Sequence, residues 1–482
     1  MLPRNKNEFK LPLLTVEDTR KLIKNAKNSW TLCGNDISMN IIKKLNDRIS
    51  PHITHLFNCI IRSGTYPEIV QISKILPLLK PKKDKFEIES YRPVNVMGPV
   101  EKLFQEHIKI HLTEFLSQNG VILESHHGGI KYHGTDTALV TVMNQLYENR
   151  DKKLNSCILQ TDLSSAFDTI DHTILFERLD YYGVRGMELN ILCNMMNNRR
   201  QFVELDTFQS TVTKSLNCSV MQGSKLSALL YSIYTNEIPM LCKIMSDDEL
   251  YNKITGGKIR NEFDARIYEK LNHFTINYID DSTNIISHKD CKLLEKYLFQ
   301  FYVLLESYYS INKLKINDDK TVLVVIDGGN NPSEASKISF FAGKYKIEQK
   351  ETVKILGYLL NNKLNHQTYL NSIISKVNLR AYTVGLISKY MSLQAKRIVY
   401  TALIIGIIRY AAVLLINMNA KQIKVFNVLI NKMGRKAMGF QSYRWTNSKV
   451  LRNCKWLNGT HILVYSVLNL IHKINFWDSQ DK

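Results

Sequence analysis

Three aspartates stand where the chain could carry out metal-assisted chemistry. Asp162 ends the apolar run SCILQTDL, and Asp280 and Asp281 are adjacent within TINYIDDSTNII. A carboxylate next to apolar residues is costly without a partner, and adjacent carboxylates repel unless a positive charge holds them together. Hard divalent cations such as Mg²⁺ take oxygen ligands, and two such ions can clamp a phosphoryl group during in-line transfer. The simpler alternative is that the Asp-Asp pair forms a turn and Asp162 caps a helix.

The segments around these aspartates have the patterns of a mixed fold. Residues 156–163 form a compact apolar run typical of a buried strand, and residues 274–287 indicate two strands joined by a tight turn at the Asp-Asp pair. Residues 171–183 and 293–314 have helical spacing, and residues 320–327 indicate another strand. Mixed helices and strands with a hairpin predict an α+β fold, with helices on one face of the sheet.

The remaining segments are mostly predicted to be helical. Within residues 1–75, Pro51 is expected to split one run into two helices, with Asp36 or Ser38 as the cap and Gly64 as the end. Further expectations are a helix over 99–118, a hairpin around Thr207–Gln209, an exposed polar insertion over 243–270, and basic helices from about Lys363 onward.

The charge balance favours a polyanionic partner. The 482 residues contain 64 Lys and Arg against 44 Asp and Glu, a net charge of +20 with a pI near 9.4. Nucleic acid and an anionic membrane surface are the two candidates. The eight cysteines include no CxxC spacing, which excludes a zinc ribbon or knuckle of that type and gives no disulfide framework. We therefore expect a reducing, intracellular compartment, nuclear or cytoplasmic.

One apolar segment, Val399–Met418, has the length of a membrane span. Arg409 lies near its middle, and a central arginine costs about 2.5–3.5 kcal/mol on insertion scales. We predict a buried helix and a protein that is neither transmembrane nor secreted, because the N-terminus MLPRNKNEFKLP has no apolar signal-peptide core.

Eight motifs, in one order along the chain, resemble the reverse transcriptases of non-LTR (LINE-like) retrotransposons. They are residues 49–84, SYRPVNVMGPVEKLFQ (90–105), HHGGIKYHGTDTAL (126–139), LQTDLSSAFDTIDHTIL (159–175), VMQGSKLSALLYSIYTNEIP (220–239), YIDD (278–281), LKINDDKT (314–321) and ILGYLLNNKLN (355–365). YIDD alone is a weak signal, whereas eight motifs in register are a strong one.

The resemblance implies a right-hand polymerase with fingers, a ferredoxin-like palm and a helical thumb. It implies a helical N-terminal extension over 1–75, fingers and palm over 76–350, and a thumb and C-terminal region over 351–482. The implied reaction is RNA-directed addition of deoxynucleotides to a DNA 3′ end by two-metal-ion catalysis. The implied partners are an RNA template, a DNA primer and deoxynucleoside triphosphates, with two Mg²⁺ ions as cofactors and Mn²⁺ as a substitute.

The family's roles carry over residue by residue. Asp162 and Asp280 would hold the two ions, with Asp281 completing the cluster. The backbone at Leu163 and Ser164 would lie along the incoming triphosphate. Phe167 would pack under the sugar, Gln222 and Gly223 would touch nucleotide and template, and Lys320 would face the triphosphate.

The other basic candidates are less specific. Arg92 and the lysines from Lys80 to Lys83 would grip triphosphate or template strand, and the motif does not say which residue takes which. Each role has a structural alternative: Phe167 as ordinary core, Lys320 as a solvated turn residue, and the lysines as a solvated run. Asp168 and Asp171 are interpreted as a helix cap and a helix-start acid, not as metal ligands.

Three departures from the family pattern bear on the site. Met221 stands where the family usually has proline, which could loosen the turn at Gln222. Ile279 fills the variable place of YxDD and is compatible with a strand hairpin. His126 and His127 replace a more usual Gln-x-Gly-Phe lead, which puts template contacts there in doubt.

Several rival interpretations remain at this point. Fewer than 80 residues precede the fingers motifs, too few for an endonuclease, so we expect a polymerase core, a fragment or a domesticated copy. An endonuclease acting in trans is one partner that this arrangement allows. The rivals are an inactive descendant that binds RNA, a viral RNA-dependent RNA polymerase, which Phe167 argues against, and a basic membrane-surface protein, for which no suitable amphipathic helix is evident.

Overall fold

The computed structural model divides the chain into two compact units. The first comprises Met1–Lys131, Asp162–Asn261 and Phe301–Asn317, and the second comprises Tyr132–Thr161, Glu262–Gln300 and Asp318–Lys482. The structure describes residues 3–33, 37–81, 83–130, 133–197, 199–205, 208–210, 213–214, 218–257, 271–329, 335–342 and 345–478.

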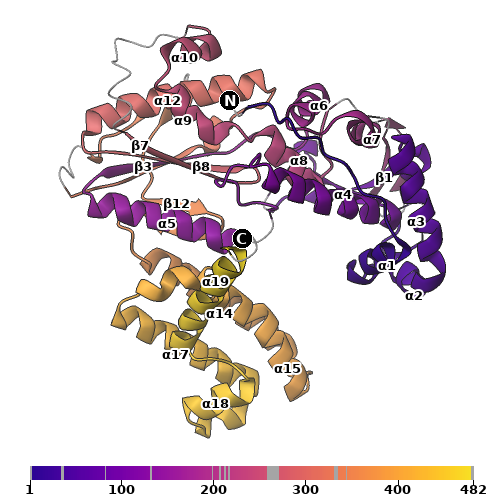
Figure 1. The fold of residues 1–482 in the computed structure, drawn as a ribbon. Coiled ribbons are helices and arrows are strands. Elements are labelled where there is room, and N and C mark those ends of the chain that lie inside the picture. The colour runs from indigo at the N-terminus through magenta and orange to yellow at the C-terminus, as the bar shows by residue number, and fades with distance from the viewer. Residues whose placement is uncertain are drawn as a thin grey trace. The chain divides into compact units, whose positions relative to one another are not determined.

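The second unit contains a four-stranded antiparallel sheet (Figure 1). Its order is β7-β8-β3-β9, built from Asn272–Tyr278, Asp281–His288, Asn155–Thr161 and Val322–Ile326. Along the chain, helices separate β3 from the β7–β8 hairpin, and α12 (Cys291–Ile311) separates the hairpin from β9. This is the β-α-β-β-α-β order of a ferredoxin-like sheet, so the expected α+β class is confirmed.

Helices cover both faces of this sheet, not the one face that we expected. On one face, α5 (Thr135–Asp151) packs its apolar side chains against Ile158 and Ile285 in the main core cluster. On the other face, Asn155 bonds to Cys291 (3.2 Å) and His273 to Tyr297 (3.0 Å), both at the start of α12. The cause is visible in β3, which is buried along nearly its whole length and therefore needs cover on both sides.

The first unit contains a second sheet, in which β1 (Ile72–Leu79) pairs antiparallel with β2 (Tyr91–Met97) and parallel with β4 (Arg200–Leu205). The short strands β5 (Phe208–Gln209) and β6 (Thr213–Lys214) pair with β4. Its helices are α1 (Val16–Asn25), α2 (Met39–Lys44), α3 (Asn46–Ser63), α4 (Pro99–Gln118), α6 (His172–Tyr181), α7 (Gly186–Met196), α8 (Ser227–Tyr234), α9 (Leu241–Ile244) and α10 (Asp248–Thr255), with short 3₁₀ turns at Glu68–Val70, Ile88–Ser90 and Ile238–Met240.

Two local expectations for the first unit need correction. Pro51 does not split a helix but lies inside α3, and the break falls at Leu45, between α2 and α3. Pro51 is close enough to the start of α3 that only an early intrahelical hydrogen bond is lost. Gly64 ends α3 in a left-handed conformation (φ 67°), as predicted. The helix over Pro99–Gln118 is confirmed.

Three further expectations fall partly on residues outside the described ranges. The hairpin around Thr207–Gln209 includes Thr207, which lies outside them, although β4 and β5 are antiparallel as expected. Ser38 occupies the N-cap position of α2 without a capping side-chain bond, and Asp36 lies outside the described ranges. The predicted insertion (243–270) overlaps the end of α9 and contains α10. Its expected exposure is wrong for Met245, between the two helices, and for Tyr251 of α10, because both are buried in the core. Its residues 258–270 lie outside the described ranges.

The rest of the second unit is mostly helical, as predicted. The helical part comes after a 3₁₀ turn and four short strands. These are the turn Asp318–Lys320 and the strands β10 (Phe340–Ala342), β11 (Tyr345–Ile347), β12 (Thr352–Ile355) and β13 (Tyr358–Asn361). The helices are α14 (Gln367–Ser388), α15 (Leu393–Tyr400), α16 (Gly406–Arg409), α17 (Ala420–Met438), α18 (Asn447–Cys454) and α19 (Gly459–Asp478), with a π turn at Thr401–Ile405 and 3₁₀ turns at Ala412–Asn417 and Phe440–Arg444.

The segment Val399–Met418 is not the single buried helix that we predicted. It passes from α15 through the π turn to α16, turns at Tyr410 and continues as the 3₁₀ turn after Ala411, which has φ 52°. Arg409 is exposed, with its guanidinium over the ring of Tyr465 at 5.8 Å, so the chain bends where the charged side chain reaches solvent. No helix of the described ranges is long and apolar enough to cross a membrane.

Candidate active site

The sheet of the second unit sets the positions of the predicted metal ligands. Thr161, the last residue of β3, pairs with Ser282 near the start of β8. Asp162 follows Thr161 in the chain. Asp280 lies in the turn between β7 and β8, where Tyr278 pairs with Asp281. The tight turn expected at the Asp-Asp pair is therefore present.

This turn leaves the carboxylates differently exposed. Asp280 is exposed and Asp281 half-buried, and Asp162, beyond the end of β3, is half-buried. Ile279 takes a left-handed conformation (φ 58°), which is uncommon for a β-branched residue and gives the turn its shape. The variable position of the motif thus tolerates Ile in this hairpin, at a cost in backbone strain.

The three carboxylates have the right chemistry for hard divalent cations. Asp and Glu oxygens are the ligands that Mg²⁺ takes from proteins. Within the described ranges, no three His, Cys, Asp or Glu side chains are gathered as a ready group of metal ligands. The strand register fixes the backbone positions next to the three carboxylates.

The chain that follows Asp162 is held by backbone hydrogen bonds within the first unit. The Asp162 carbonyl accepts from the Asn317 amide (2.8 Å), and the Ser164 amide donates to the Lys315 carbonyl (2.9 Å). Leu163 is buried and forms a bridge to Ile316. The Ser164 amide is therefore engaged inside the protein, which limits what it can donate to a ligand.

Phe167 sits in a well-defined environment four residues further on from Leu163. Its ring stacks on that of Tyr231, with centroids 5.2 Å apart and planes 25° apart. Its carbonyl accepts a hydrogen bond from the Val220 amide (2.8 Å), just before the loop that carries Gln222. The ring is half-buried, so it has both a fixed orientation and a surface to offer.

The loop with Gln222 and Gly223 is tied to β2. The Gln222 carbonyl accepts from the Asn95 amide (2.8 Å). Gly223 has φ 109°, and a Cβ placed there would lie 2.7 Å from the Asn95 carbonyl oxygen. Only glycine fits this backbone conformation and this close approach. The loop therefore presents Gln222 from a position that a larger residue would displace.

The family comparison agrees with this geometry. Residues 80–360, more than half of the chain, match the family model described as reverse transcriptase (RNA-dependent DNA polymerase). The matched range contains β3, the β7–β8 hairpin and the Gln222 loop.

This chain belongs to the reverse transcriptase family.

Its curated relatives come from mobile elements. It is 22% identical over 409 residues to a protein described as a probable RNA-directed DNA polymerase from transposon BS of Drosophila melanogaster, covering 82% of this chain and 41% of that protein. It is 27% identical over 229 residues to the RNA-directed DNA polymerase from mobile element jockey of Drosophila funebris, covering 47% of this chain and 24% of that protein. The chain thus spans less than half the length of these relatives.

Asp168 has a role in the structure that the sequence interpretation missed. Of the two acids interpreted as a helix cap and a helix-start acid, Asp171 is the N-cap of α6, and its carboxylate accepts from the Ile174 amide (3.1 Å). Asp168 instead accepts a hydrogen bond from Gln222 Nε2 (3.3 Å). Burial raises the pKa of Asp168, and the bond to Gln222 and the charge of Lys80 oppose that shift. Asp168 is therefore an anchor for the Gln222 side chain.

The basic candidates are only partly brought together. Lys80 donates to the Glu89 carbonyl (2.7 Å), and its charge reaches Asp168. Arg92 is exposed on β2, and Lys320 is exposed in the 3₁₀ turn Asp318–Lys320. Lys82 lies outside the described ranges. The structure thus links Lys80 to the Gln222 loop through Asp168.

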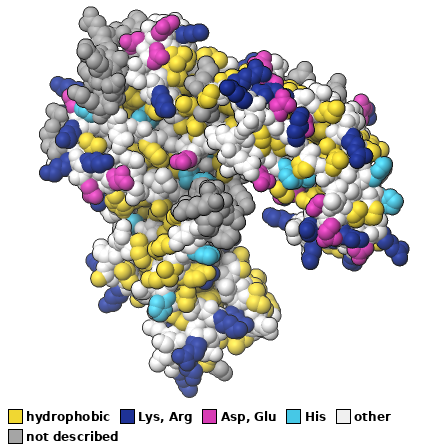
Figure 2. All heavy atoms as spheres, in the orientation of Figure 1, with side chains coloured by type: hydrophobic (Ala, Val, Ile, Leu, Met, Phe, Trp, Pro, Cys, Tyr) yellow, Lys and Arg dark blue, Asp and Glu magenta, His cyan; other side chains and the backbone are white. Residues whose placement is uncertain are grey.

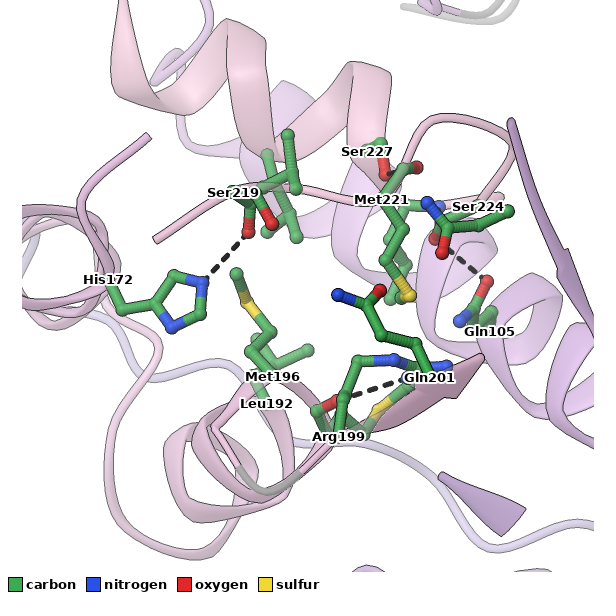
Figure 3. Close-up of a pocket in the computed structure, with 15 residues that line it drawn as sticks. Gln105, His172, Leu192, Met196, Arg199, Gln201, Ser219, Met221, Ser224 and Ser227 are labelled. Atoms are coloured by element: carbon green, nitrogen blue, oxygen red, sulfur yellow. Dashed lines mark hydrogen bonds between the residues drawn. The ribbon is translucent and has the colours of Figure 1, made fainter. Parts of the chain in front are cut away.

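A small cavity of about 40 Å³ lies behind the same loop (Figure 3). Figure 3 shows the Met221 side chain reaching toward Gln201, and the bond from His172 Nε2 to the Ser219 carbonyl (2.8 Å). The Met221 carbonyl accepts from Ser227 Oγ (2.7 Å) and the Ser224 amide (3.1 Å). The turn is therefore closed by serine donors at the position where the family usually has proline.

A buried ion pair supports this loop from α4. Arg199 binds the Glu101 carboxylate through both terminal nitrogens (2.7 and 3.1 Å), and Gln105 connects Glu101 to the loop by accepting from Ser224 Oγ (2.9 Å). Burial raises the pKa of Glu101, while Arg199 opposes the shift. Glu101 and Gln105 are one helical turn apart in the sequence, a spacing that could have indicated their shared role.

The doubt about template contacts at His126 and His127 is supported by their burial. His126 is 1% exposed and His127 6% exposed. Burial lowers the pKa of His126 to about 4, so the ring is neutral at physiological pH. Neither side chain is placed to grip a phosphate backbone.

Proposed function

We propose that this chain is an RNA-directed DNA polymerase of the non-LTR retroelement type, adding deoxynucleotides to a DNA 3′ end on an RNA template. One observation carries the proposal: in a member of the reverse transcriptase family, the ferredoxin-like sheet sets Asp162 at the end of β3 and Asp280 and Asp281 at the β7–β8 turn. Family membership alone would not exclude a chain that had lost its carboxylates. Their retention in this arrangement supports catalysis.

The catalytic assignment is that Asp162, Asp280 and Asp281 hold two Mg²⁺ ions, with Mn²⁺ as a substitute. When bound, such ions lower the pKa of an attacking hydroxyl and stabilise negative charge on a leaving pyrophosphate. The exposed Asp280 is accessible to an ion carried in with a nucleotide. Asp162 has its main chain fixed by the bond from Asn317, which restricts where its carboxylate can reach.

Nucleotide selection is assigned to Phe167 and the Gln222 loop. The stacked, half-buried ring of Phe167 is suited to close the space that a ribose 2′-hydroxyl would need. Gln222 and Gly223 would contact nucleotide and template from the loop that Asn95 and Asp168 hold. Leu163 and Ser164 would line the triphosphate path, with Lys80, Arg92 and Lys320 as candidate phosphate contacts.

The basic C-terminal segment supports a phosphate-binding role. Residues 352–477 contain 18 Lys and Arg and no Asp or Glu, which amounts to 18 of the chain's 20 net positive charges. On the visible face of α14–α19, Figure 2 shows dark blue Lys and Arg side chains without magenta acidic ones. This charge supports an assignment of 351–482 as thumb and C-terminal region, after an N-terminal extension (1–75) and fingers and palm (76–350).

The partners follow from this assignment. They are an RNA template, a DNA primer and deoxynucleoside triphosphates, with an endonuclease in trans as a candidate source of the primer. A membrane is not among the partners that we propose. The second candidate function is RNA binding without catalysis by an inactive descendant. The third is a viral-type RNA polymerase, and Phe167 argues against it because its ring favours deoxynucleotides over ribonucleotides.

Primer extension on poly(rA)/oligo(dT) tests the proposal directly. Wild-type protein should extend the primer in the presence of Mg²⁺ and dTTP, and Asp280→Asn should not. Asp247→Asn is a matched control, because Asp247 is a helix N-cap far along the chain from the proposed ligands and asparagine can also cap. Absence of extension by the folded wild-type protein, with RNA binding intact, would favour the non-catalytic alternative.

A further inference from the structure

The second unit contains an open polar cavity that none of the proposed catalytic roles uses. Its volume is about 600 Å³, within the range of about 300–1,000 Å³ typical of small-molecule sites. It is formed by the last turn of α5, the connection from β13 to α14 and the start of α17. The lining residues that matter here are Tyr147, Arg150, Asp151, Asn365, Asn417 and Asn419.

We propose that this cavity binds one unpaired nucleotide of RNA, at a site separate from the polymerase carboxylates. Proteins recognise single-stranded RNA by stacking a splayed base on an aromatic ring or an Arg guanidinium and by hydrogen bonding to its edge. The cavity offers both kinds of contact within a space of suitable volume. The choice of RNA as the source of the nucleotide rests on the proposed function.

Tyr147 and Arg150 supply the planar surface. The Arg150 guanidinium lies over the Tyr147 ring, 5.1 Å from its centroid. The Tyr147 ring packs against the main core cluster, and its hydroxyl interacts with the Asn417 side chain. Burial raises the pKa of Tyr147, so the hydroxyl is protonated at physiological pH. Because the Tyr147 ring is fixed at both ends and lies beside an exposed guanidinium, little further side-chain entropy is lost when a base stacks there.

Asn365 and Asn419 supply hydrogen-bond donors. Asn365 Oδ1 accepts from Asn361 Nδ2 (2.8 Å) and from the Gln367 amide (3.1 Å), and Asn419 Oδ1 accepts from the Gln422 amide (2.9 Å). These bonds at the starts of α14 and α17 fix which end of each carboxamide is the oxygen. In the described part of the chain neither Nδ2 donates to another protein group, so both remain available to acceptors on a base.

The charges around the cavity suit a nucleotide better than an acidic peptide. Asp151 is the one carboxylate among the described lining residues, and it can accept from the amino group of a base. An acidic peptide would bring its own carboxylates toward Asp151 and has no ring for the Tyr147–Arg150 surface. A nucleotide, unlike such a peptide, has a base that can stack on that surface.

Photocrosslinking locates the RNA contact. Full-length protein bound to RNA containing 4-thiouridine, in EDTA to remove divalent ions, is irradiated, digested and mapped by mass spectrometry. We expect a crosslink on the peptide that contains Tyr147, reduced at least about fivefold by Arg150→Ala. Arg452→Ala is the matched control: Arg452 is an exposed arginine of α18 outside the cavity, and its replacement should leave the crosslink unchanged.

One further variant and three competitors separate the alternatives. Arg150→Lys keeps the charge but loses the planar group, so its crosslink should stay as low as that of Arg150→Ala. A crosslink at the wild-type level in Arg150→Lys would indicate a phosphate contact only and would overturn the base-binding proposal. AMP should compete for the crosslink better than ribose 5-phosphate, which lacks the base. Displacement of RNA by poly-glutamate but not by AMP would assign the cavity to an acidic protein instead. Circular dichroism confirms that each variant is folded.

The outcome is distinguishable from failure of the proposed polymerase activity. Arg150→Ala should extend oligo(dT) on poly(rA) within about twofold of wild type, and Asp280→Asn should keep the crosslink. A crosslink retained in a wild-type protein that extends no primer would count against the polymerase assignment alone. Extension without any crosslink at Tyr147 would overturn the cavity proposal alone.

Discussion

The Gln222 loop and the basic C-terminal segment 352–477 use charge in opposite ways. Around the loop, acidic and basic side chains have individual partners: Asp168 with Gln222, Glu101 with Arg199, and Asp171 with Lys313 at 2.6 Å. The basic C-terminal segment has 18 Lys and Arg and no Asp or Glu. Paired charges fix the positions of particular atoms, whereas an unbalanced excess attracts a polyanion with little dependence on any one residue. Substitutions should therefore have local, large effects in the first region and small, additive effects in the second.

The largest expected effect is at the carboxylates. Asp162→Ala, Asp280→Ala and Asp281→Ala should each lower primer extension by orders of magnitude, because two ions are no longer held at the spacing needed for phosphoryl transfer. Template–primer affinity, measured by filter binding at fixed salt, should change little. Near-wild-type extension by a folded Asp280→Ala protein would remove the proposed mechanism.

Affinity for nucleic acid should instead depend on the total charge. Raising salt from about 50 to 200 mM should weaken template–primer binding by about 10³ if about six phosphates are bound. Replacing the exposed Lys376 and Arg380 by Gln should reduce the slope of log K against log salt by about 0.9 for each phosphate that the variant no longer neutralises. Lys289→Gln, at an exposed lysine outside 352–477, is the matched control. A slope unchanged in the double variant would place the binding surface elsewhere.

Gly223 tests how far the loop depends on its exact backbone path. Gly223→Ala should lower kcat/KM for dTTP about 100-fold, because its Cβ would force the loop away from Asn95 and a misplacement of about 1 Å is costly in catalysis. Gly256→Ala is the control, since Gly256 also has a positive φ (66°) but no atom within 4 Å of the added Cβ. Equal losses in the two variants would mean that general backbone strain, and not the loop position, is responsible.

Phe167 should have a smaller, selective effect. Phe167→Val should raise ribonucleotide incorporation at least about tenfold, equivalent to about 1.4 kcal/mol, by opening space for the 2′-hydroxyl. Incorporation of deoxynucleotides should fall less than this. Rates with dTTP and UTP on the same template give the ratio. An unchanged preference for deoxynucleotides would place the sugar selection at another residue.

The dependence of stability on acid pH should reveal a contribution from the buried His126. Burial lowers the pKa of His126 to about 4, against about 6.5 in an unfolded chain. The unfolded state therefore takes up the proton first, and stability is lost as pH falls from about 6.5 to 4, by about 3 kcal/mol for this group. His126→Gln should flatten the dependence of Tm on pH across this window. A Tm profile that keeps the wild-type slope would assign the acid sensitivity to other groups.

The sequence by itself determined the elements whose cause is local. The apolar run of β3, the turn at Asp280 and Asp281 and the helix Pro99–Gln118 follow from patterns within a few residues, and all three are present in the structure. The family motifs likewise predicted a reverse transcriptase, and the chain belongs to that family. The assignment of individual site residues remains a prediction, because it concerns ligands and chemistry.

Only the tertiary structure decided features that join distant parts of the chain. The bond from Gln222 to Asp168 spans 54 positions, and the one from Arg199 to Glu101 spans 98, so neither pairing is visible in local spacing. The cover on both faces of the sheet and the bend at Arg409 also depend on what packs alongside. The local sequence pattern indicates whether a segment prefers helix or strand. Burial and hydrogen bonds to residues far along the chain decide where its side chains point and which groups they contact.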